Sequence, residues 1–180
     1  MKYVAVAILI LLGCVSVLCG QTDQPSTTVA NPVVATVRQM ETRFAKNLVG
    51  AAEEMPADKY SYRPTPEQMT FAHLIMHTTE ANNSLCSAVA GEKPHEMKLS
   101  ENDSKDMLTK ALKDSFAYCE QTLAKADDTG LGQTVTLYEN QTGTRASALV
   151  RMAAGWADHY SAAAMYLRLN NLVPPSAQKH

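Results

Sequence analysis

The sequence predicts an all-α protein built as a single four-helix bundle. Three observations support this fold class. Four segments repeat apolar residues at three- and four-residue spacing, which is the period of an amphipathic helix. Each segment is bounded by helix-capping residues, prolines or glycines. The length of 180 residues suits one domain with a sizeable core once a short leader is set aside.

The first helix is predicted to begin at Asn31-Pro32 and to end near Met55-Pro56. Asn31 is expected to cap it, because asparagine is a favoured N-cap and proline is favoured at the first helical position. Its predicted apolar stripe consists of Val33, Val37, Met40, Phe44 and Leu48.

The second helix is predicted to begin at Thr65-Pro66-Glu67-Gln68, which fits a capping box with proline at the first helical position. Gly91 is expected to end it. Its predicted stripe consists of Phe71, Leu74, Ile75, Thr78, Ala81, Leu85 and Val89.

Ser104 is expected to cap the third helix, which ends in the polar stretch at residues 125–133. Residues 134–140 read TVTLYEN and are β-prone by composition. They have no obvious partner strand, so we expect a long extended segment that crosses to the last helix. The stripe of the third helix consists of Leu108, Leu112, Ser115, Phe116, Cys119 and Leu123.

The fourth and longest helix is predicted from Thr144 to about Asn170, and Pro174-Pro175 forbids its continuation. Residues 32–175 are therefore assigned to the bundle, residues 21–31 to a flexible lead-in and residues 176–180 to a tail. The stripe of this helix consists of Leu149, Met152, Trp156, His159, Tyr160, Ala163, Tyr166 and Leu167.

The N-terminus is typical of a bacterial secretory signal. Lys2 is followed by an uncharged run from Tyr3 to Gly20, which is too short and too close to the start for a membrane span. We expect a signal peptide over residues 1–20 and an exported protein, periplasmic or extracellular. The alternative is a lipoprotein box at Leu11–Cys14, in which Cys14 would carry a lipid anchor.

The charge argues against nucleic acid as a partner, and the hydropathy argues against a transmembrane segment in the mature chain. The formal net charge of −2 becomes about −3 once Lys2 is removed with the signal, and the chain has no Lys/Arg run. Nucleic acid is therefore not expected as a partner. No apolar run after residue 20 is long enough to cross a bilayer, so no transmembrane segment is expected in the mature chain.

Two of the four cysteines, Cys14 and Cys19, lie in the predicted signal. Cys86 and Cys119 remain in the exported chain. Two thiols outside the reducing cytoplasm favour one structural disulfide. Two buried free thiols and a reactive pair are the alternatives.

Three of the five histidines bear on function. His73 and His77 are four residues apart on the second helix and share one face, and His159 lies on the apolar stripe of the last helix. Neutral imidazole is a strong ligand for zinc, nickel or iron. On pattern alone, however, a lone histidine among apolar residues is more often hydrogen-bonded to a neighbour. His95, in a polar loop, and His180 are expected to be solvated.

Residues 55–91 and 159–175 resemble the DinB-like (damage-inducible) superfamily, and within it the exported bacterial members. The most specific features are Tyr-Ser-Tyr-Arg-Pro at 60–64, Thr-Phe followed by His within 70–77, and Tyr-Leu-Arg-Leu-Asn at 166–170 with a later Pro-Pro. The resemblance covers about Val33 to Pro175 and implies a four-helix bundle.

The resemblance also implies a divalent-metal site made by three histidines, one from the second helix and two from a His-x-x-x-His pair on the last. His77 and His159 match two of these positions, but Gly155 stands at the third and offers no ligand atom. Three outcomes follow. The site is metal-free, or His73 or Glu80 supplies a third ligand to zinc or nickel, or water completes a weak site.

The superfamily includes thiol-dependent transferases and isomerases. Their low-molecular-weight thiols are cytosolic cosubstrates, so the resemblance does not extend this activity to an exported chain, and we leave the reaction unassigned. Exported relatives carry a similar cysteine pair, and relatives are often homodimers, which makes a homodimer possible here.

The alternative function is a metal-free, disulfide-stabilised bundle that binds a partner or a small apolar ligand between its helices. Gly155 would then open a pocket instead of marking a lost ligand. The pocket would be lined by Met76, Met152, Trp156 and Tyr160. A merely packed interior is the alternative to both functions.

Overall fold

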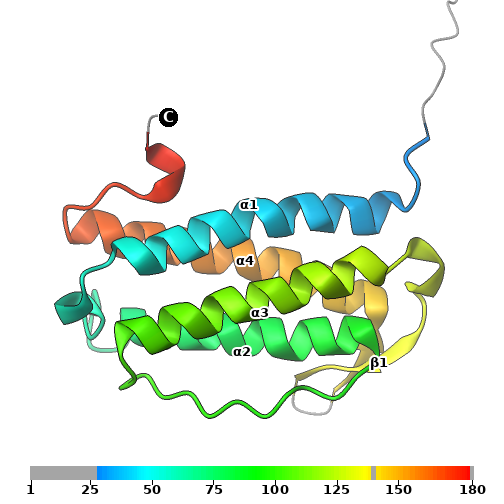
Figure 1. Cartoon of the computed structure of the whole chain (residues 1–180), viewed down its shortest axis with the longest axis horizontal. Helices are drawn as coiled ribbons and strands as arrows, with labels where there is room; N and C mark the ends of the chain where they lie inside the picture. The colour runs from blue at the N-terminus through cyan, green and yellow to red at the C-terminus, as the bar shows by residue number, and fades with distance from the viewer. Residues whose placement is uncertain (1–27, 139–140, 179–180) are drawn as a thin grey trace, which may run out of the picture.

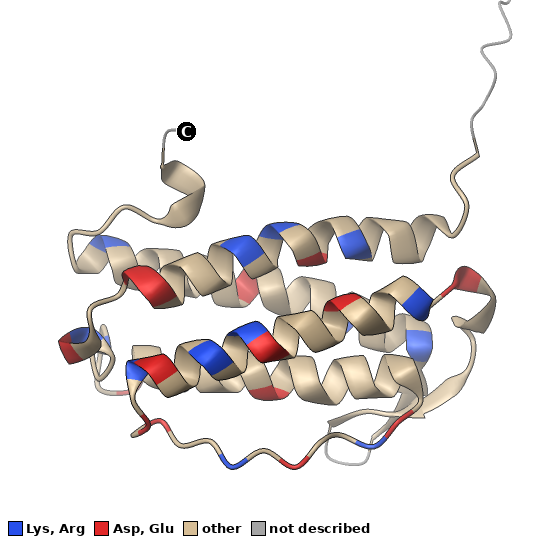
Figure 2. Ribbon diagram, in the orientation of Figure 1, with Lys and Arg blue, Asp and Glu red and all other residues tan. Residues whose placement is uncertain are grey.

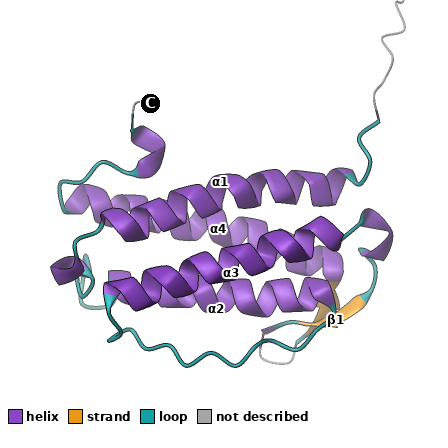
Figure 3. Cartoon of the chain, viewed as in Figure 1, coloured by secondary structure: helices purple, strands orange, loops and turns teal. Residues whose placement is uncertain are grey.

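The computed structural model describes residues 28–138 and 141–178 and confirms a four-helix bundle (Figure 3). The predicted signal peptide, Cys14 and most of the lead-in lie outside the described residues. The long helices are α1 (Pro32–Glu54), α2 (Phe71–Ala90), α3 (Lys105–Lys125) and α4 (Arg145–Leu169). Short 3-10 turns are η1 (Ala57–Lys59), η2 (Asp128–Gly130) and η4 (Pro175–Ala177), and the strands are β1 (Thr134–Thr136) and β2 (Thr142–Thr144).

The bundle has a crossover topology. Both α1 and α2 pack against α3 and α4, so α1 and α2 lie diagonally opposite each other. Figure 1 shows that α2 and α3 run in one direction while α1 and α4 run in the other. Residues 91–104 therefore travel the length of the bundle, because they join two parallel helices.

The segment before α4 crosses the end of the bundle as predicted, but it forms a strand that pairs with a second strand. β1 pairs antiparallel with β2, with Val135 opposite Gly143. This pairing was not predicted, because the partner strand lies in the polar stretch that directly precedes α4. Thr144 then caps α4 through a capping box with Ser147.

The predicted stripes form the core with one shift in α1. Val34 is buried while Val33 is 40% exposed, and Glu41 rather than Met40 occupies the next buried turn. The helix is rotated from the predicted phase because α3 and α4 cover it from two sides. The largest fully buried side chains are Trp156, Phe71, Leu48, Met55, Leu74, Ile75, Leu108, Leu112, Leu123, Leu149, Met152 and Leu167.

α2 begins later than the capping box at Thr65–Gln68 predicts. That segment forms a turn, and Thr70 is the N-cap, accepting a hydrogen bond from the backbone N–H of His73 at 3.0 Å. The backbone N–H of Phe71 donates to the carbonyl of Tyr62 at 2.9 Å. The preceding loop thus satisfies a first-turn amide and moves the start of the helix.

The N-terminus of α1 is capped by a residue far away in the sequence. Asn31 has left-handed backbone geometry (φ 51°) and makes no side-chain cap. Instead, both carboxylate oxygens of Asp128 in η2 accept from the amides of Val33 and Val34, at 2.9 and 3.0 Å. A carboxylate at a helix N-terminus is favourable because it faces the positive end of the helix dipole.

A disulfide between Cys86 and Cys119 joins α2 to α3, with a Cα–Cα distance of 5.3 Å. The predicted structural disulfide is therefore present. Both cysteines are fully buried, so the bond forms part of the core and not a surface-exposed reactive pair.

The chain beyond α4 returns to the bundle. The hydroxyl of Tyr160 donates to Ser176 Oγ at 2.6 Å and accepts from the Ser176 amide at 2.9 Å. Pro175 is buried against α1, where a β-carbon at Gly50 would lie 3.0 Å from the proline ring. The first residue of the predicted tail is thus hydrogen-bonded to the bundle.

The long 91–104 connection is fastened to the helices. Asn83 donates to the carbonyl of His95 at 2.7 Å and accepts from its amide at 3.2 Å. The His95 ring lies 4.8 Å from that of Tyr118 between centroids, so this histidine has a packing role that the sequence did not predict.

Charged side chains of both signs are interspersed along α1 and α3 in Figure 2. Such mixing is typical of a solvated helix face. Among the residues that the structure describes, no helix is long and apolar enough to cross a membrane.

Candidate functional site

The structure brings His77 and His159 together. His77 lies on α2 and His159 on α4, and the two rings meet edge to face with their centroids 5.0 Å apart. Both side chains are half-buried at the contact between the two helices. His159 is directed there because its neighbours on the same helix face, Trp156 and Tyr160, are buried in the core.

One ring nitrogen of this pair has no partner. Nδ1 of His159 is inaccessible to solvent and makes no hydrogen bond within the described chain. Burial lowers the pKa of His159, and the neighbouring His77 lowers it further, against a small opposing effect of Asp158. The imidazole is therefore held neutral, which is the form that coordinates metals.

Gly155 leaves space beside the pair. A β-carbon built on Gly155 would have only Cε1 of His159 nearby, at 3.8 Å, which is an ordinary van der Waals contact. The position where the resemblance expects a ligand is thus empty for lack of a side chain and is not blocked by packing.

Neither predicted substitute supplies a third ligand. Nδ1 of His73 lies 3.3 Å from the carboxylate of Glu101, which also accepts a hydrogen bond from Thr70 at 3.0 Å. Glu80 is exposed on α2. Within residues 28–138 and 141–178, no group of three or more His, Cys, Asp or Glu side chains could hold a metal ion. The donor set that the chain itself offers is two imidazoles.

The residues predicted to line an apolar pocket fill the interior instead. Trp156 is 2% exposed and donates its indole N–H to Oδ1 of Asn82 at 2.7 Å. Met152 is 1% exposed, and Tyr160 holds Ser176 through its hydroxyl. Met76 is half-buried on α2 and packs against the core cluster that contains Met152, Trp156 and Tyr160.

Asn82 fixes the helix that carries His159. Its amide oxygen accepts from Trp156, one turn before His159, and its amide nitrogen donates to Ser115 Oγ at 3.0 Å. These two buried hydrogen bonds link α2, α3 and α4 next to the histidine pair. Sequence reasoning missed Asn82, although a buried tryptophan needs an acceptor and an asparagine on a neighbouring stripe could have indicated one.

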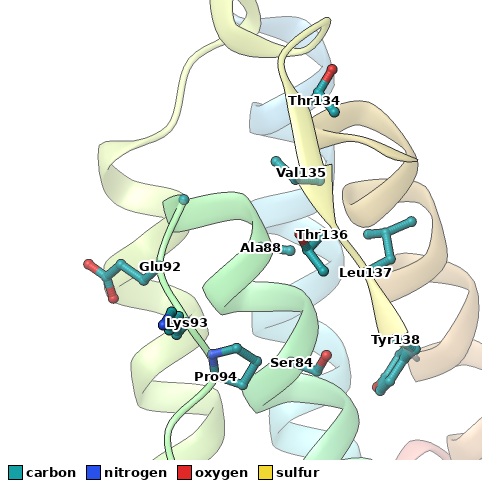
Figure 4. Close-up of a pocket in the computed structure, with 11 residues that line it drawn as sticks. Ser84, Ala88, Glu92, Lys93, Pro94, Thr134, Val135, Thr136, Leu137 and Tyr138 are labelled. Atoms are coloured by element: carbon teal, nitrogen blue, oxygen red, sulfur yellow. The ribbon is translucent and has the colours of Figure 1, made fainter. Parts of the chain in front are cut away.

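Tyr138 is the second residue that the sequence did not indicate. It follows β1, and its hydroxyl is inaccessible to solvent and has no hydrogen-bond partner in the described chain. Burial raises the pKa of Tyr138, and the negative charge of Glu80 on α2 raises it further. Tyr138 ends a groove of about 840 Å³ bounded by β1, the C-terminal half of α2 and residues 91–94 (Figure 4).

Comparisons with known proteins agree with this architecture. The family model of the DinB superfamily matches residues 42–161. A DinB-like protein from Bacillus cereus has a TM-score of 0.65 at 12% identity, covering 78% of this chain and 95% of that one. A conserved protein from Enterococcus faecalis has a TM-score of 0.62 at 16% identity, covering 76% and 96%.

Mycothiol-dependent maleylpyruvate isomerase has a TM-score of 0.59 at 14% identity, covering 71% of this chain and 59% of that one. At these identities the solved structures show a shared fold. A search of curated proteins gives no match. Because the family match spans most of the bundle, the chain belongs to the DinB superfamily.

Proposed function

We propose that this chain is an exported DinB-superfamily protein that binds a divalent metal ion weakly through His77 and His159. The observation that carries the proposal is the buried, partnerless Nδ1 of His159 beside the ring of His77. A buried polar atom without a partner is costly, and an ion bound between the two rings would remove that cost.

The donor set limits which ion would bind and how tightly. Imidazole nitrogens suit zinc and nickel. Two protein ligands leave coordination positions for water or for a bound molecule, which is the arrangement of an open site and not of a closed structural one. The reaction remains unassigned, and the likeness to an isomerase is a likeness of fold.

Export is supported by two features that are independent of the histidines. The first 20 residues have the composition of a secretory signal. The Cys86–Cys119 disulfide suits an oxidising compartment, since cytosolic thiols are kept reduced.

The test is metal binding by the purified chain without residues 1–20. Isothermal titration with zinc and with nickel should give about one weak site for the wild type. His77→Ala and His159→Ala should each lose it, while His95→Ala should retain it because His95 contacts Tyr118 instead. A wild type that binds neither ion, or histidine variants that bind like the wild type, would refute the proposal.

A further inference from the structure

We propose that the free edge of β1 is a binding site for an extended, uncharged peptide segment, which would add to the hairpin as a third strand. This site is separate from the histidine pair and does not depend on the proposed metal. It lies in the groove between β1 and residues 91–94 (Figure 4).

The register of the hairpin decides which backbone groups are free. The amide of Leu137 donates to Gln141 at 2.7 Å, and the amide of Arg145 donates to Gln133 at 2.9 Å. With Val135 opposite Gly143, the odd-numbered residues of this strand bond toward β2. The N–H and C=O groups of Thr134 and Thr136 therefore point to the opposite edge, where the structure records no backbone partner among the described residues.

The free edge of β1 forms one wall of the groove. Figure 4 shows β1 and the Glu92–Pro94 loop as opposite walls, with Ala88 and Ser84 of α2 between them. Tyr138 closes one end. The free N–H and C=O groups of Thr134 and Thr136 suit a polypeptide backbone, which recognises a strand edge by main-chain hydrogen bonds.

The position and the charges of the groove favour a single uncharged peptide strand. Neighbouring strands lie about 4.8 Å apart, so one added strand would lie directly beside β1, between it and residues 91–94. Glu92 and Lys93 place opposite charges on the loop wall, so the groove has no net preference for an anion or a cation. Ala88 and Ser84 are small and leave room for side chains such as Val or Thr.

The experiment is an NMR titration of the ¹⁵N-labelled chain with a blocked hexapeptide of alternating threonine and valine. The amide signals of Thr134 and Thr136 should shift together, with saturation in the micromolar to millimolar range expected of few hydrogen bonds. The same peptide with alternate backbone nitrogens methylated should not bind, because it cannot donate to the strand edge.

Three variants separate backbone recognition from side-chain contact. Thr136→Pro removes an outward N–H that takes no part in pairing with β2, and it should weaken peptide binding by about fivefold, the change expected for one hydrogen bond. Tyr138→Phe removes only a hydroxyl that is inaccessible to solvent, so it should bind the peptide like the wild type. Thr136→Ala keeps the backbone N–H and should bind like the wild type.

Equal binding of the methylated peptide, or no shift at millimolar peptide, would overturn the proposal. So would a concentration-dependent dimer that Thr136→Pro abolishes, because the edge would then pair with a second copy of the chain. His77→Ala should leave peptide binding unchanged, so failure of the metal proposal and failure of this one are distinguishable.

Discussion

The ring of His77 meets the ring of His159 edge to face, 5.0 Å between centroids, across the contact of α2 with α4. The two residues are far apart in the chain, and they meet because α2 and α4 are packed neighbours. One turn before His159, the hydrogen bond from Trp156 to Asn82 fixes the register of the two helices. The pair is thus held by the core beneath it, as a ligand site requires.

Restoring the third imidazole should create a tight site. Gly155→His should bind zinc about 100-fold more tightly than the wild type, because a third ligand is added at a position where a β-carbon makes only an ordinary van der Waals contact. At zinc concentrations about 100 times the dissociation constant, this variant should gain about 2.7 kcal/mol of stability. Thermal unfolding with and without zinc measures the gain.

Gly155→Ala is the matched control for that variant. It gains about 1 kcal/mol in helix propensity, more than histidine gains at the same position, without a ligand atom, so the two variants are compared by their change on adding zinc. A zinc-dependent rise in melting temperature that is equal in the two variants would mean that the space beside His159 does not place a third ligand correctly.

Glu41 should make the bundle less stable as the pH rises. The pKa of Glu41 is raised to about 7, mainly by burial and then by the charge of Glu120 on α3, against smaller opposing effects of Thr42 and Arg38. The folded chain then holds a proton that the unfolded chain, with an ordinary pKa of 4.5, releases. Stability should therefore fall between about pH 4.5 and 7 and level off above that range.

Glu41→Gln tests this dependence, since it keeps the shape and removes the charge. At pH 8 it should be more stable than the wild type by about 1–2 kcal/mol, allowing for screening by nearby solvent. Urea unfolding at pH 5 and pH 8 provides the comparison. If the difference between the two proteins does not change with pH, Glu41 is not the group that titrates.

Removing the disulfide should destabilise the chain without changing the fold. Cys86→Ser combined with Cys119→Ser opens a loop of 33 residues, at a cost of about 3–4 kcal/mol in the chain-entropy account. Each serine also places a hydroxyl in a fully buried position, so Cys86→Ala with Cys119→Ala serves as the apolar control. Unfolding midpoints that match the oxidised wild type in both doubles would show that the bond contributes little.

Asp128→Ala should weaken the start of α1. It removes the carboxylate that accepts from the amides of Val33 and Val34, and loss of such a cap costs about 0.5–2 kcal/mol. Hydrogen exchange should quicken at the first turn of α1 and remain slow at Leu48 in its buried half. Asp128→Asn keeps an acceptor oxygen, so it should lose less stability than Asp128→Ala. Unchanged exchange in the alanine variant would mean that water replaces the cap without loss.

The sequence alone determined the features that depend on local pattern. The four helices, the cap at Ser104, the start of the last helix at Thr144 and the stop at Gly91 are present as predicted, and three of the four apolar stripes keep their predicted phase. These signals are local because a helix repeats every 3.6 residues and a cap satisfies amides within its own first turn. The pairing of Cys86 with Cys119 was also predictable, since only two cysteines follow the predicted leader.

The tertiary structure decided everything that joins distant segments. It assigned the cap of α1 to Asp128, paired β1 with β2, rotated α1 so that Glu41 is buried, and buried Trp156 and Met152 in the core. It also showed that His73 lies beside the carboxylate of Glu101 and that a β-carbon at Gly155 would contact only Cε1 of His159. Periodicity fixes which face of a helix is apolar, but the neighbours on that face follow only from how the helices pack.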